Sequence, residues 1–306
     1  MLTELVPVDR RRFMQCLAWA GTGLLWAARG GLLSSTALGE AAAAGDFTFA
    51  QISDTHVGFA GKANANAAGT LADSIAAINA LEPRPAFVIH TGDLTHGQKA
   101  GAFDMLAESL KAVRTERIFY VPGEHDVFLD GGKEYLARHG RGTLGGGWQS
   151  FDYHGVHFVG LVNVLTYKAG VGGALGAEQL EWLRQDLEAR GPSTPVVVFT
   201  HVPLWAVYPA WGWTTADGAA AIAMLRRFGS VTVLNGHIHQ VFQKVDGSVT
   251  FHSARSTAFP QPAPGAAPTP GPMTVEAGEL RRLLGVREVR YTESPAQLAI
   301  VERPLA

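Results

Sequence analysis

The stretch FTFAQISDTH, residues 47–56, joins an apolar run to a polar ending, a pattern that the chain repeats four more times. Aromatic and β-branched residues in such a short run predict a buried strand. Asp54 and His56 form the polar ending of this first run. The other runs are AFVIHT (86–91), RIFYVP (117–122), VVVFTH (196–201) and VTVLNG (231–236). In open α/β sheets ligands bind beyond the carboxyl ends of the strands, so the repeated pattern predicts one shared site.

Segments between these runs carry apolar residues at a spacing near 3.6, which predicts amphipathic helices. They are residues 64–81, 102–113, 177–189 and 218–228. Hairpins are predicted with turns at 154–155 and 246–247, and closing strands at 285–294 and 297–304. The proline-rich stretch 259–272 predicts a surface loop. Strands that alternate with helices in this way are typical of an α/β sandwich.

The first 44 residues have the pattern of an export signal. The sequence RRRFM at 10–14 resembles a twin-arginine motif, with Gln15 in place of the more usual lysine. The apolar run 16–28 that follows is too short to span a bilayer, which takes about 20 residues. We therefore expect export by the twin-arginine machinery to the periplasm or the extracellular space, with 45–306 as a single domain. An uncleaved anchor is the alternative.

Charge and cysteine content narrow the possible partners. The net charge is −2, so the chain has no net positive charge that would attract nucleic acid, and we expect no nucleic acid to bind. The only cysteine, Cys16, lies within the predicted signal, so no disulfide is expected in the remaining chain. No stable membrane span is expected after signal removal, and the sequence makes no prediction of oligomeric state.

The polar endings supply candidate metal ligands. Asp54 and His56 stand two residues apart, as do His237 and His239. Residues i and i+2 of an extended strand project to the same side, so each pair is predicted to hold a metal like a two-pronged clip. Imidazole and carboxylate together suit Zn, Mn or Fe better than calcium. The polar residues at the five strand ends are Asp54, His56, Asp93, Glu124, His125, Asp126, His201, His237 and His239.

The order D-x-H, G-D, G-x-H-D, a lone H after an apolar strand and G-H-x-H resembles the calcineurin-like metallophosphoesterases, from about Phe47 to His239. The resemblance implies a four-layer αββα sandwich of two mixed sheets flanked by helices, with two metal ions bridged by one carboxylate. The first ion would bind Asp54, His56, Asp93 and His239, and the second Asp93, Glu124, His201 and His237.

Two features of the pattern indicate which class within this family it resembles. The initial Asp-x-His, and His96 in place of a tyrosine, distinguish it from the purple acid phosphatases. The pattern as a whole is most similar to the class that includes bacterial cyclic nucleotide phosphodiesterases. It departs from the family at Glu124, because GEHD replaces the usual GNHD.

The predicted function is that of a secreted dinuclear-metal phosphoesterase acting on small phosphodiesters. Two ions about 3.5–4 Å apart would activate a bridging hydroxide for in-line attack. His125 is the predicted general acid for the leaving oxygen. Asp126 either orients the His125 ring or caps the turn. A phosphomonoesterase, or a non-catalytic protein that binds metal or phosphate, are the alternatives.

Glu124 bears on the choice between these functions. An asparagine would ligate a metal through its carbonyl and offer its NH₂ to the phosphate, whereas an ionised Glu124 has no hydrogen to donate. Its charge repels a monoester dianion more than a diester monoanion. The substitution therefore favours a diesterase with tight metal binding, unless Glu124 turns away from the metal.

A further set of side chains is predicted to contact the substrate. His96 either faces the phosphate or caps a turn. The aromatic residues after His201 either pack in the core or form a wall on which a flat group stacks. Arg255 is close enough in sequence to the last metal pair to reach a substrate anion. The candidates are His96, Trp205, Tyr208, Trp211, Trp213 and Arg255.

Overall fold

The computed structural model describes residues 24–29, 32–37, 45–276, 278–294 and 296–306. The described residues of the first 44 form a hairpin, in which β1 (Leu24–Arg29) pairs antiparallel with β2 (Leu32–Ala37). The arginines of the predicted export motif lie outside the described residues. Within the described part of the chain, no helix combines the length and the apolar character needed to cross a bilayer.

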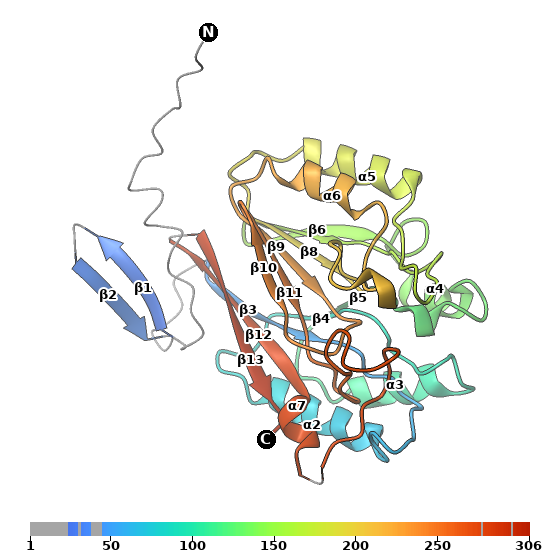
Figure 1. Ribbon diagram of the computed structural model, residues 1–306. Helices are drawn as coiled ribbons and strands as arrows, with labels where there is room; N and C mark the ends of the chain where they lie inside the picture. Colours follow the sequence, from blue (N-terminus) through green and yellow to red (C-terminus); the bar gives the residue numbers. More distant parts are fainter. Residues whose placement is uncertain (1–23, 30–31, 38–44, 277, 295) are drawn as a thin grey trace. The chain divides into compact units, whose positions relative to one another are not determined.

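Gly45–Ala306 form a compact unit with two mixed sheets between layers of helices (Figure 1). The strands of the first sheet are β3 (Phe47–Ile52), β4 (Val88–His90), β5 (Ile118–Tyr120), β12 (Gly285–Glu293) and β13 (Ala296–Pro304). Their order is β13-β12-β3-β4-β5. The strands of the second sheet are β6 (Gln149–Tyr153), β7 (Val156–Gly160), β8 (Val196–Thr200), β9 (Val231–Asn235), β10 (Gln243–Asp246) and β11 (Val249–Ser253). Their order is β10-β11-β9-β8-β7-β6.

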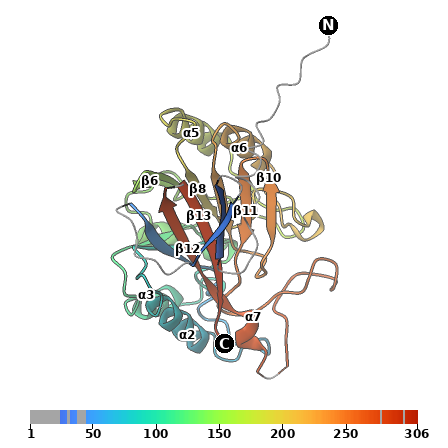
Figure 2. The same cartoon turned by 90° about the vertical axis from the view of Figure 1, so that its left-hand side faces the viewer.

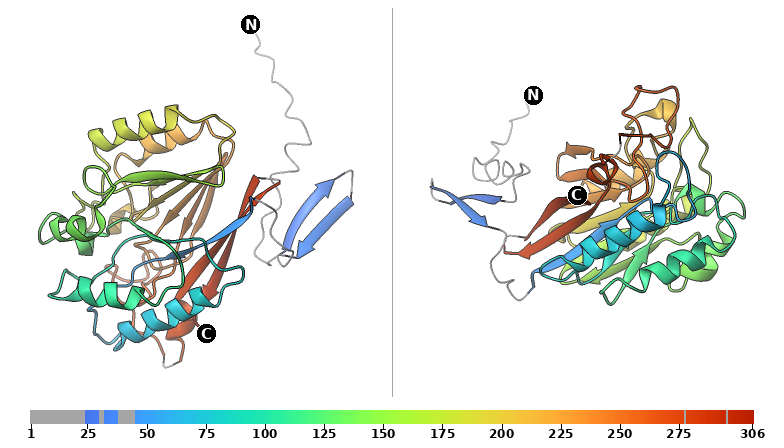
Figure 3. Two further views of the ribbon diagram at one scale, coloured as in Figure 1. Left: turned by 180° about the vertical axis from the view of Figure 1, so that it is seen from behind. Right: turned by 90° about the horizontal axis from the view of Figure 1, so that it is seen from below.

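Helices cover the outer face of each sheet. Helices α2 (Ala67–Asn79) and α3 (Ala102–Leu110) pack on the first sheet. Helices α5 (Ala177–Glu188) and α6 (Gly218–Leu225) pack on the second. Figure 2 shows the two helix pairs on opposite sides of the strands, and Figure 3 gives the same layering from behind. The predicted four-layer αββα sandwich is confirmed.

Alternation along the strands explains why each sheet can be buried on both faces. In β8, Val196 and Val198 pack toward α5 and α6, whereas Val197 and Phe199 face the other sheet. Successive side chains of a strand point to opposite faces, so an all-apolar strand fills two cores at once. The core between the sheets is rich in phenylalanine, including Phe49 and Phe158.

The predicted elements are largely confirmed, with local corrections. The hairpin turn at 154–155 lies where it was expected, and the second turn falls at 247–248, one residue later than predicted. The proline-rich segment is a loop, but it does not lie wholly on the surface, because Phe259 is buried. Short helical elements were not predicted. They are η1 (Glu124–Asp126), α4 (Lys133–His139), η2 (Pro209–Trp211) and α7 (Leu280–Leu283).

The parallel strands end at one level, and this alignment positions the site. In the first sheet Ile52 pairs with His90, and His90 pairs with Tyr120. In the second sheet Thr200 pairs with Asn235. These five residues are the last of β3, β4, β5, β8 and β9. The polar segments that follow therefore leave both sheets along the same edge, as the sequence predicted.

A buried arginine ties the two sheets together beneath that edge. Arg287 of β12 is 1% exposed and donates from Nη1 to Gln51 Oε1 at 2.8 Å and from Nε to Glu302 Oε1 at 2.6 Å. Its Nη2 donates across to the second sheet, to the carbonyl oxygen of Ser253 at 2.6 Å. Gln51 extends the network by donating to Thr91 Oγ1 at 3.0 Å. A buried charge is tolerated because every side of the guanidinium is paired.

We expect Arg287→Met to lower the free energy of unfolding by about 3–5 kcal/mol, since it leaves Glu302, Gln51 and a carbonyl without their donor. Urea unfolding at fixed metal concentration measures the loss. Arg226→Met is the matched control, because Arg226 pairs with Asp246 on the surface and should contribute much less. Equal losses in the two variants would contradict the structural role assigned to Arg287.

Candidate metal centre

The first group of candidate ligands contains Asp54, His56 and His239, whose ligand atoms all lie within 4.8 Å of one another. His56 Nε2 is 3.2 Å from His239 Nε2, and His239 Nε2 is 3.3 Å from Asp54 Oδ1. All three side chains are almost fully buried. Atoms at these separations can bind one ion together.

The second group contains Glu124, His201 and His237. Glu124 Oε2 lies 2.9 Å from His201 Nε2, and Glu124 Oε1 lies 3.1 Å from His237 Nδ1. The Glu124 side chain is 18% exposed and points between the two imidazoles. It therefore occupies the place expected of a ligand, and it does not turn away.

Asp93 lies between the two groups. Its Oδ2 is 3.4 Å from His56 Nε2 in the first group and 3.5 Å from His201 Nε2 in the second. Its other oxygen, Oδ1, accepts a hydrogen bond of 3.0 Å from the backbone N–H of His125. One carboxylate oxygen therefore faces both groups while the other is held by the backbone, which is the arrangement that a bridging ligand requires.

The local backbone corrects the prediction of two-pronged clips on extended strands. Strands β3 and β9 end before the ligands, and His237 and His239 belong to different groups. Most ligand residues adopt a left-handed backbone, which costs a non-glycine residue roughly 1–3 kcal/mol. These residues are Asp54 (φ 53°), His56 (φ 40°), Asp93 (φ 51°), His237 (φ 69°) and His239 (φ 54°). The pair Asp54 and His56 still shares the first group, as predicted, whereas His237 and His239 belong to different groups.

Glycines allow the ligand loops to approach each other. A Cβ on Gly123 would lie 2.0 Å from Asp93 Oδ1, and a Cβ on Gly236 would lie 2.6 Å from Asp54 Oδ2. Neither distance is tolerated between unbonded atoms. Gly92 permits a sharp turn, since its φ is +95°, whereas Gly123 and Gly236 are needed for space.

Hydrogen bonds fix the ligand rings from behind. His201 Nδ1 lies 2.7 Å from the carbonyl oxygen of Thr91, and His239 Nδ1 lies 2.6 Å from that of Phe259. A carbonyl only accepts, so each ring carries a proton on Nδ1 and turns Nε2 toward the centre. The Asp54 carboxylate in turn accepts from the backbone N–H of His237 at 3.1 Å. The donor set is therefore ready to bind metal.

The electrostatics of the two groups favour the metal-binding forms of the carboxylates. Burial opposes ionisation of Glu124, but His237 and His201 hold its pKa well below the usual value. Burial lowers the pKa of His56, and the neighbouring His239 adds to the effect, so this ring is neutral. Burial would also lower the pKa of His201, yet Asp93 and Glu124 raise it well above its usual value. Metal binding would displace that proton.

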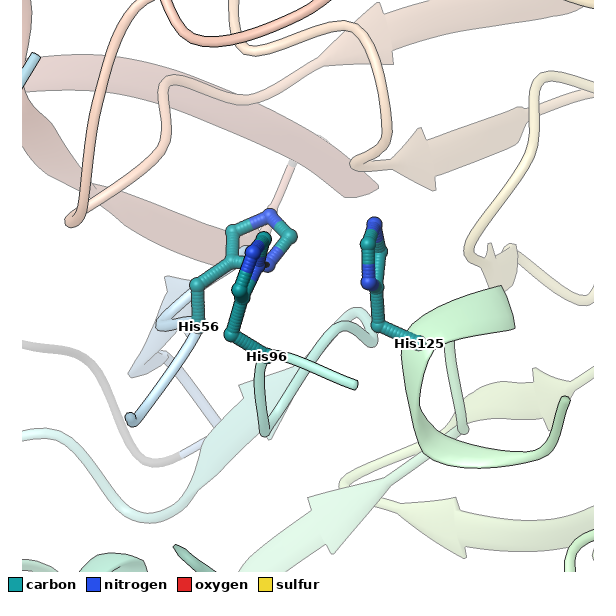
Figure 4. Close-up of side chains that lie close together, drawn as sticks. All are labelled: His56, His96 and His125. Atoms are coloured by element: carbon teal, nitrogen blue, oxygen red, sulfur yellow. Dashed lines mark hydrogen bonds between the residues drawn. The ribbon is translucent and has the colours of Figure 1, made fainter. Parts of the chain in front are cut away.

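His96 and His125, from separate loops, lie beside the ligand His56 of the first group (Figure 4). His96 Nδ1 is 3.2 Å from His56 Nδ1, and the ring stacks on His125 with a centroid distance of 4.8 Å. His96 therefore contacts a ligand ring directly. Burial would lower the pKa of His125, but Asp93 and Glu124 raise it, which favours the protonated ring.

Asp126 braces the loops and takes the turn-capping role of the two that the sequence allowed. Its Oδ2 accepts from the backbone N–H groups of Leu94 and Gly123, both at 2.9 Å, and its Oδ1 accepts from that of Thr95 at 2.8 Å. These bonds tie the loop after β4 to the loop after β5. Asp126 thus holds Asp93 and Glu124 near each other through the backbone, which makes it a positioning residue.

The aromatic residues that were predicted to contact the substrate occupy different positions in the structure. Trp211 and Trp213 are buried with Ile238, and Tyr208 packs against them. Trp205 packs on the outer face of the second sheet. These aromatic residues form core rather than a continuous wall, although Trp213 also lines a cavity beside the metal centre.

Arg255 faces away from a substrate position at the centre. Its Nη1 donates to the carbonyl oxygens of Arg282 and Leu283, at the end of α7. Its place in the sequence, shortly after the last metal pair, gave no information about this direction.

Sequence reasoning missed Tyr167 and Phe259. Tyr167 Oη lies 3.3 Å from His237 Nε2. The Phe259 ring stacks on His56 at a centroid distance of 4.7 Å. Tyr167 follows β7, which is parallel to β8 and ends at the same edge, so the rule of strand ends could have found it. Phe259 lies in the proline-rich loop, where nothing in the sequence indicated a buried position.

We expect Asp93→Asn to weaken metal binding by at least tenfold at both positions, because one charged oxygen faces both groups. Metal content after chelation and reloading, measured by mass spectrometry, tests this, with circular dichroism to verify the fold. Asp104→Asn is the control, since Asp104 pairs with Arg138 at the surface. If the Asp93→Asn variant retained two ions as well as the wild type does, Asp93 would not be a bridging ligand.

Comparisons with solved structures support the fold. A dimetal phosphatase from Danio rerio covers 85% of this chain and 96% of its own, with a TM-score of 0.63 and 16% identity. A purple acid phosphatase from Lupinus luteus covers 85% of this chain and 54% of its own, with a TM-score of 0.54 and 12% identity. At these identities the likeness concerns the fold alone.

Curated relatives include proteins named as phosphatases and as phosphodiesterases. The serine/threonine-protein phosphatase CPPED1 of Bos taurus is 33% identical over 140 residues, 43% of this chain and 44% of that protein. A 3',5'-cyclic-nucleotide phosphodiesterase from Nostoc is 24% identical over 218 residues, 69% of this chain and 79% of that protein. The probable glycerophosphodiester phosphodiesterase GpdQ of Arcobacter nitrofigilis is 29% identical over 164 residues, 50% of this chain and 56% of that protein.

The chain thus spans under half of the bovine relative and just over half of the Arcobacter one. A family model described as calcineurin-like phosphoesterase matches residues 47–241, which is more than half of the chain and includes every candidate ligand. The family match, the two mixed sheets and the two groups of ligands agree, and the chain belongs to the calcineurin-like phosphoesterase family.

Proposed function

We propose that this protein is an exported phosphoesterase with two metal ions that hydrolyses phosphodiesters in preference to phosphomonoesters. The observation that carries the proposal is the position of Asp93, whose Oδ2 lies 3.4 Å from a ligand of the first group and 3.5 Å from a ligand of the second. A single shared carboxylate between two sets of imidazole and carboxylate donors is the arrangement of a dinuclear hydrolase.

The donor set fits two ions of zinc, manganese or iron. Both groups combine imidazole nitrogen with carboxylate oxygen, and these metals accept both. Two such ions would supply the Lewis acidity that activates a water and holds the phosphate oxygens. The chain keeps them in place through the carbonyl oxygens that fix His201 and His239.

His125 is the residue that we assign to proton donation. It is outside the first and second ligand groups, although a ring nitrogen lies within 4.8 Å of carboxylate oxygens of Asp93 and Glu124. Its side chain lines the cavity, and its backbone N–H positions Asp93. A protonated imidazole at the mouth of the site can donate to an oxygen leaving phosphorus. His96 stacks on this ring and limits its rotation.

Glu124 supports the preference for diesters. Its carboxylate lies between His201 and His237, at the inner wall of the cavity. A like charge at 4 Å costs about 4 kcal/mol at an effective dielectric constant near 20, and a dianion meets twice the repulsion of a monoanion. The metal ions offset part of this repulsion for both substrates, and the difference between them remains. The Nostoc and Arcobacter relatives, which are named as phosphodiesterases, are consistent with this preference.

The wild-type enzyme should hydrolyse bis(p-nitrophenyl) phosphate with a higher kcat/KM than p-nitrophenyl phosphate. We expect Glu124→Asn and Glu124→Gln each to raise the ratio of monoester to diester turnover at least fivefold, since both remove the charge. Glu124→Gln keeps the side-chain length and serves as the steric control. Both variants should bind the second metal more weakly.

Three other outcomes have distinct meanings. A wild-type enzyme that prefers the monoester would support the phosphomonoesterase alternative. Metal-loaded protein with no turnover of either ester would support a binding protein. An unchanged ratio in both variants would show that Glu124 does not act on the substrate.

Export by the twin-arginine route is a separate part of the proposal, and it rests on the sequence at 10–14. We expect the triple variant Arg10→Lys, Arg11→Lys, Arg12→Lys to leave folded, metal-loaded protein in the cytoplasm. Cell fractionation measures the distribution, and Arg29→Lys is the control within the same segment. Continued export of the triple variant would indicate the general secretory route.

A further inference from the structure

A cavity of about 560 Å³ opens directly beside the second ligand group. Glu124, His125 and His237 form its inner wall. The rest of the lining comes from Trp213 and from loops that include residues 127–131, 164–169 and 261–271. Its volume lies within the range of small-molecule sites, about 300–1,000 Å³.

The outer wall of this cavity is apolar. Val127 and Val164 are buried at its base, whereas Phe128 is 61% exposed and Leu165 is 44% exposed at its rim. The Phe128 ring stands edge-on to the His125 ring, with a centroid distance of 6.3 Å. Large apolar side chains left exposed beside a cluster of charged ligands indicate a surface that an apolar group covers.

The cavity also lacks the groups that a second anion would need. No lysine or arginine is among the described residues that line it, and Glu124 contributes a negative charge. The polar side chains of the lining include Gln261, whose amide already donates to the carbonyl oxygen of His237 at 3.0 Å. His125, which the proposed mechanism uses as the proton donor, is the one cationic side chain of the described lining, so a phosphate or carboxylate on the bound alcohol would lose hydration without gaining a further charged partner.

We propose that this cavity binds the leaving alcohol of the diester, and that this alcohol is neutral and apolar. The inference rests on the proposed function and adds its substrate class. In hydrolysis the water oxygen bonds to phosphorus and gives up a proton to solvent, the bond from phosphorus to the alcohol oxygen breaks, and that oxygen takes a proton from His125, which solvent then restores. Attack and departure are in line, so the leaving oxygen lies on the side away from the ligand groups. His125 and the apolar side chains line the cavity beside the second ligand group, which can receive that oxygen.

The test measures which of the two ester bonds of methyl hexyl phosphate the enzyme breaks, the bond to the methyl oxygen or the bond to the hexyl oxygen. Methanol and hexanol are similar leaving groups, so the choice reports which alcohol occupies the cavity. Burying one methylene favours binding by about fourfold, and several should be buried. We expect release of hexanol, with methyl phosphate as the other product, to exceed release of methanol at least tenfold. Phosphorus NMR of the products measures the ratio.

Variants of the apolar residues at the rim test whether this cavity selects the leaving alcohol. Phe128→Ser and Leu165→Ser should each lower the ratio at least threefold, because each removes apolar surface from the cavity. Leu129→Ser is the matched control: Leu129 is 64% exposed and is not among the lining residues, so the ratio should stay at its wild-type value. Melting temperatures verify that each variant is folded.

Different results would refute the leaving-group cavity and the proposed diesterase function. If the diester is hydrolysed with equal release of both alcohols, or if both rim variants keep the wild-type ratio, the leaving-group cavity is refuted and the diesterase function stands. If metal-loaded protein hydrolyses neither methyl hexyl phosphate nor bis(p-nitrophenyl) phosphate, the proposed function is refuted and the inference fails with it.

Discussion

The crowding of seven ionisable side chains at the meeting edge of two sheets is the constraint on which the site depends. Four imidazoles and three carboxylates lie with their nitrogen and oxygen atoms about 3 Å apart, and nearly all are buried. Such a group is stable only if its charges neutralise each other or bind a cation. Five of the seven also adopt a left-handed backbone. The rigid layers of the sandwich hold these strained residues in place, and metal binding would offset the cost.

The two sheets support each other's ligands. Asp54, which follows the first sheet, is held by the backbone of His237 from the second. His201, which follows the second sheet, is held by the carbonyl of Thr91 from the first. Below them, Arg287 and Gln51 join the sheets through buried hydrogen bonds. Neither ligand group can therefore shift without moving the other, and this coupling keeps the Asp93 oxygen in reach of both.

A single turn combines the chemistry and the proposed specificity. Residues 121–131 carry Glu124 toward the ligand groups, His125 to the mouth of the cavity and Phe128 to its rim. Asp126 anchors this turn to the loop of Asp93 by accepting backbone hydrogen bonds from Leu94 and Thr95, and it accepts a third from Gly123 within the turn. The negative charge inside and the apolar surface outside both disfavour a highly charged substrate. The replacement of asparagine by Glu124 is thus consistent with the shape of the cavity beside it.

The sequence by itself determined the sandwich and all seven candidate ligands, because burial on both faces forces apolar strands and polar residues can only follow where those strands end. It could not determine side-chain directions in irregular segments. The aromatic residues at 205–213, Arg255 and Phe259 all lie close to ligands in sequence, yet only some approach the centre. Loop direction follows from packing between distant segments, such as Phe259 against His56, and no local pattern records it. Only the tertiary structure could therefore place Tyr167, the apolar cavity and the bracing role of Asp126.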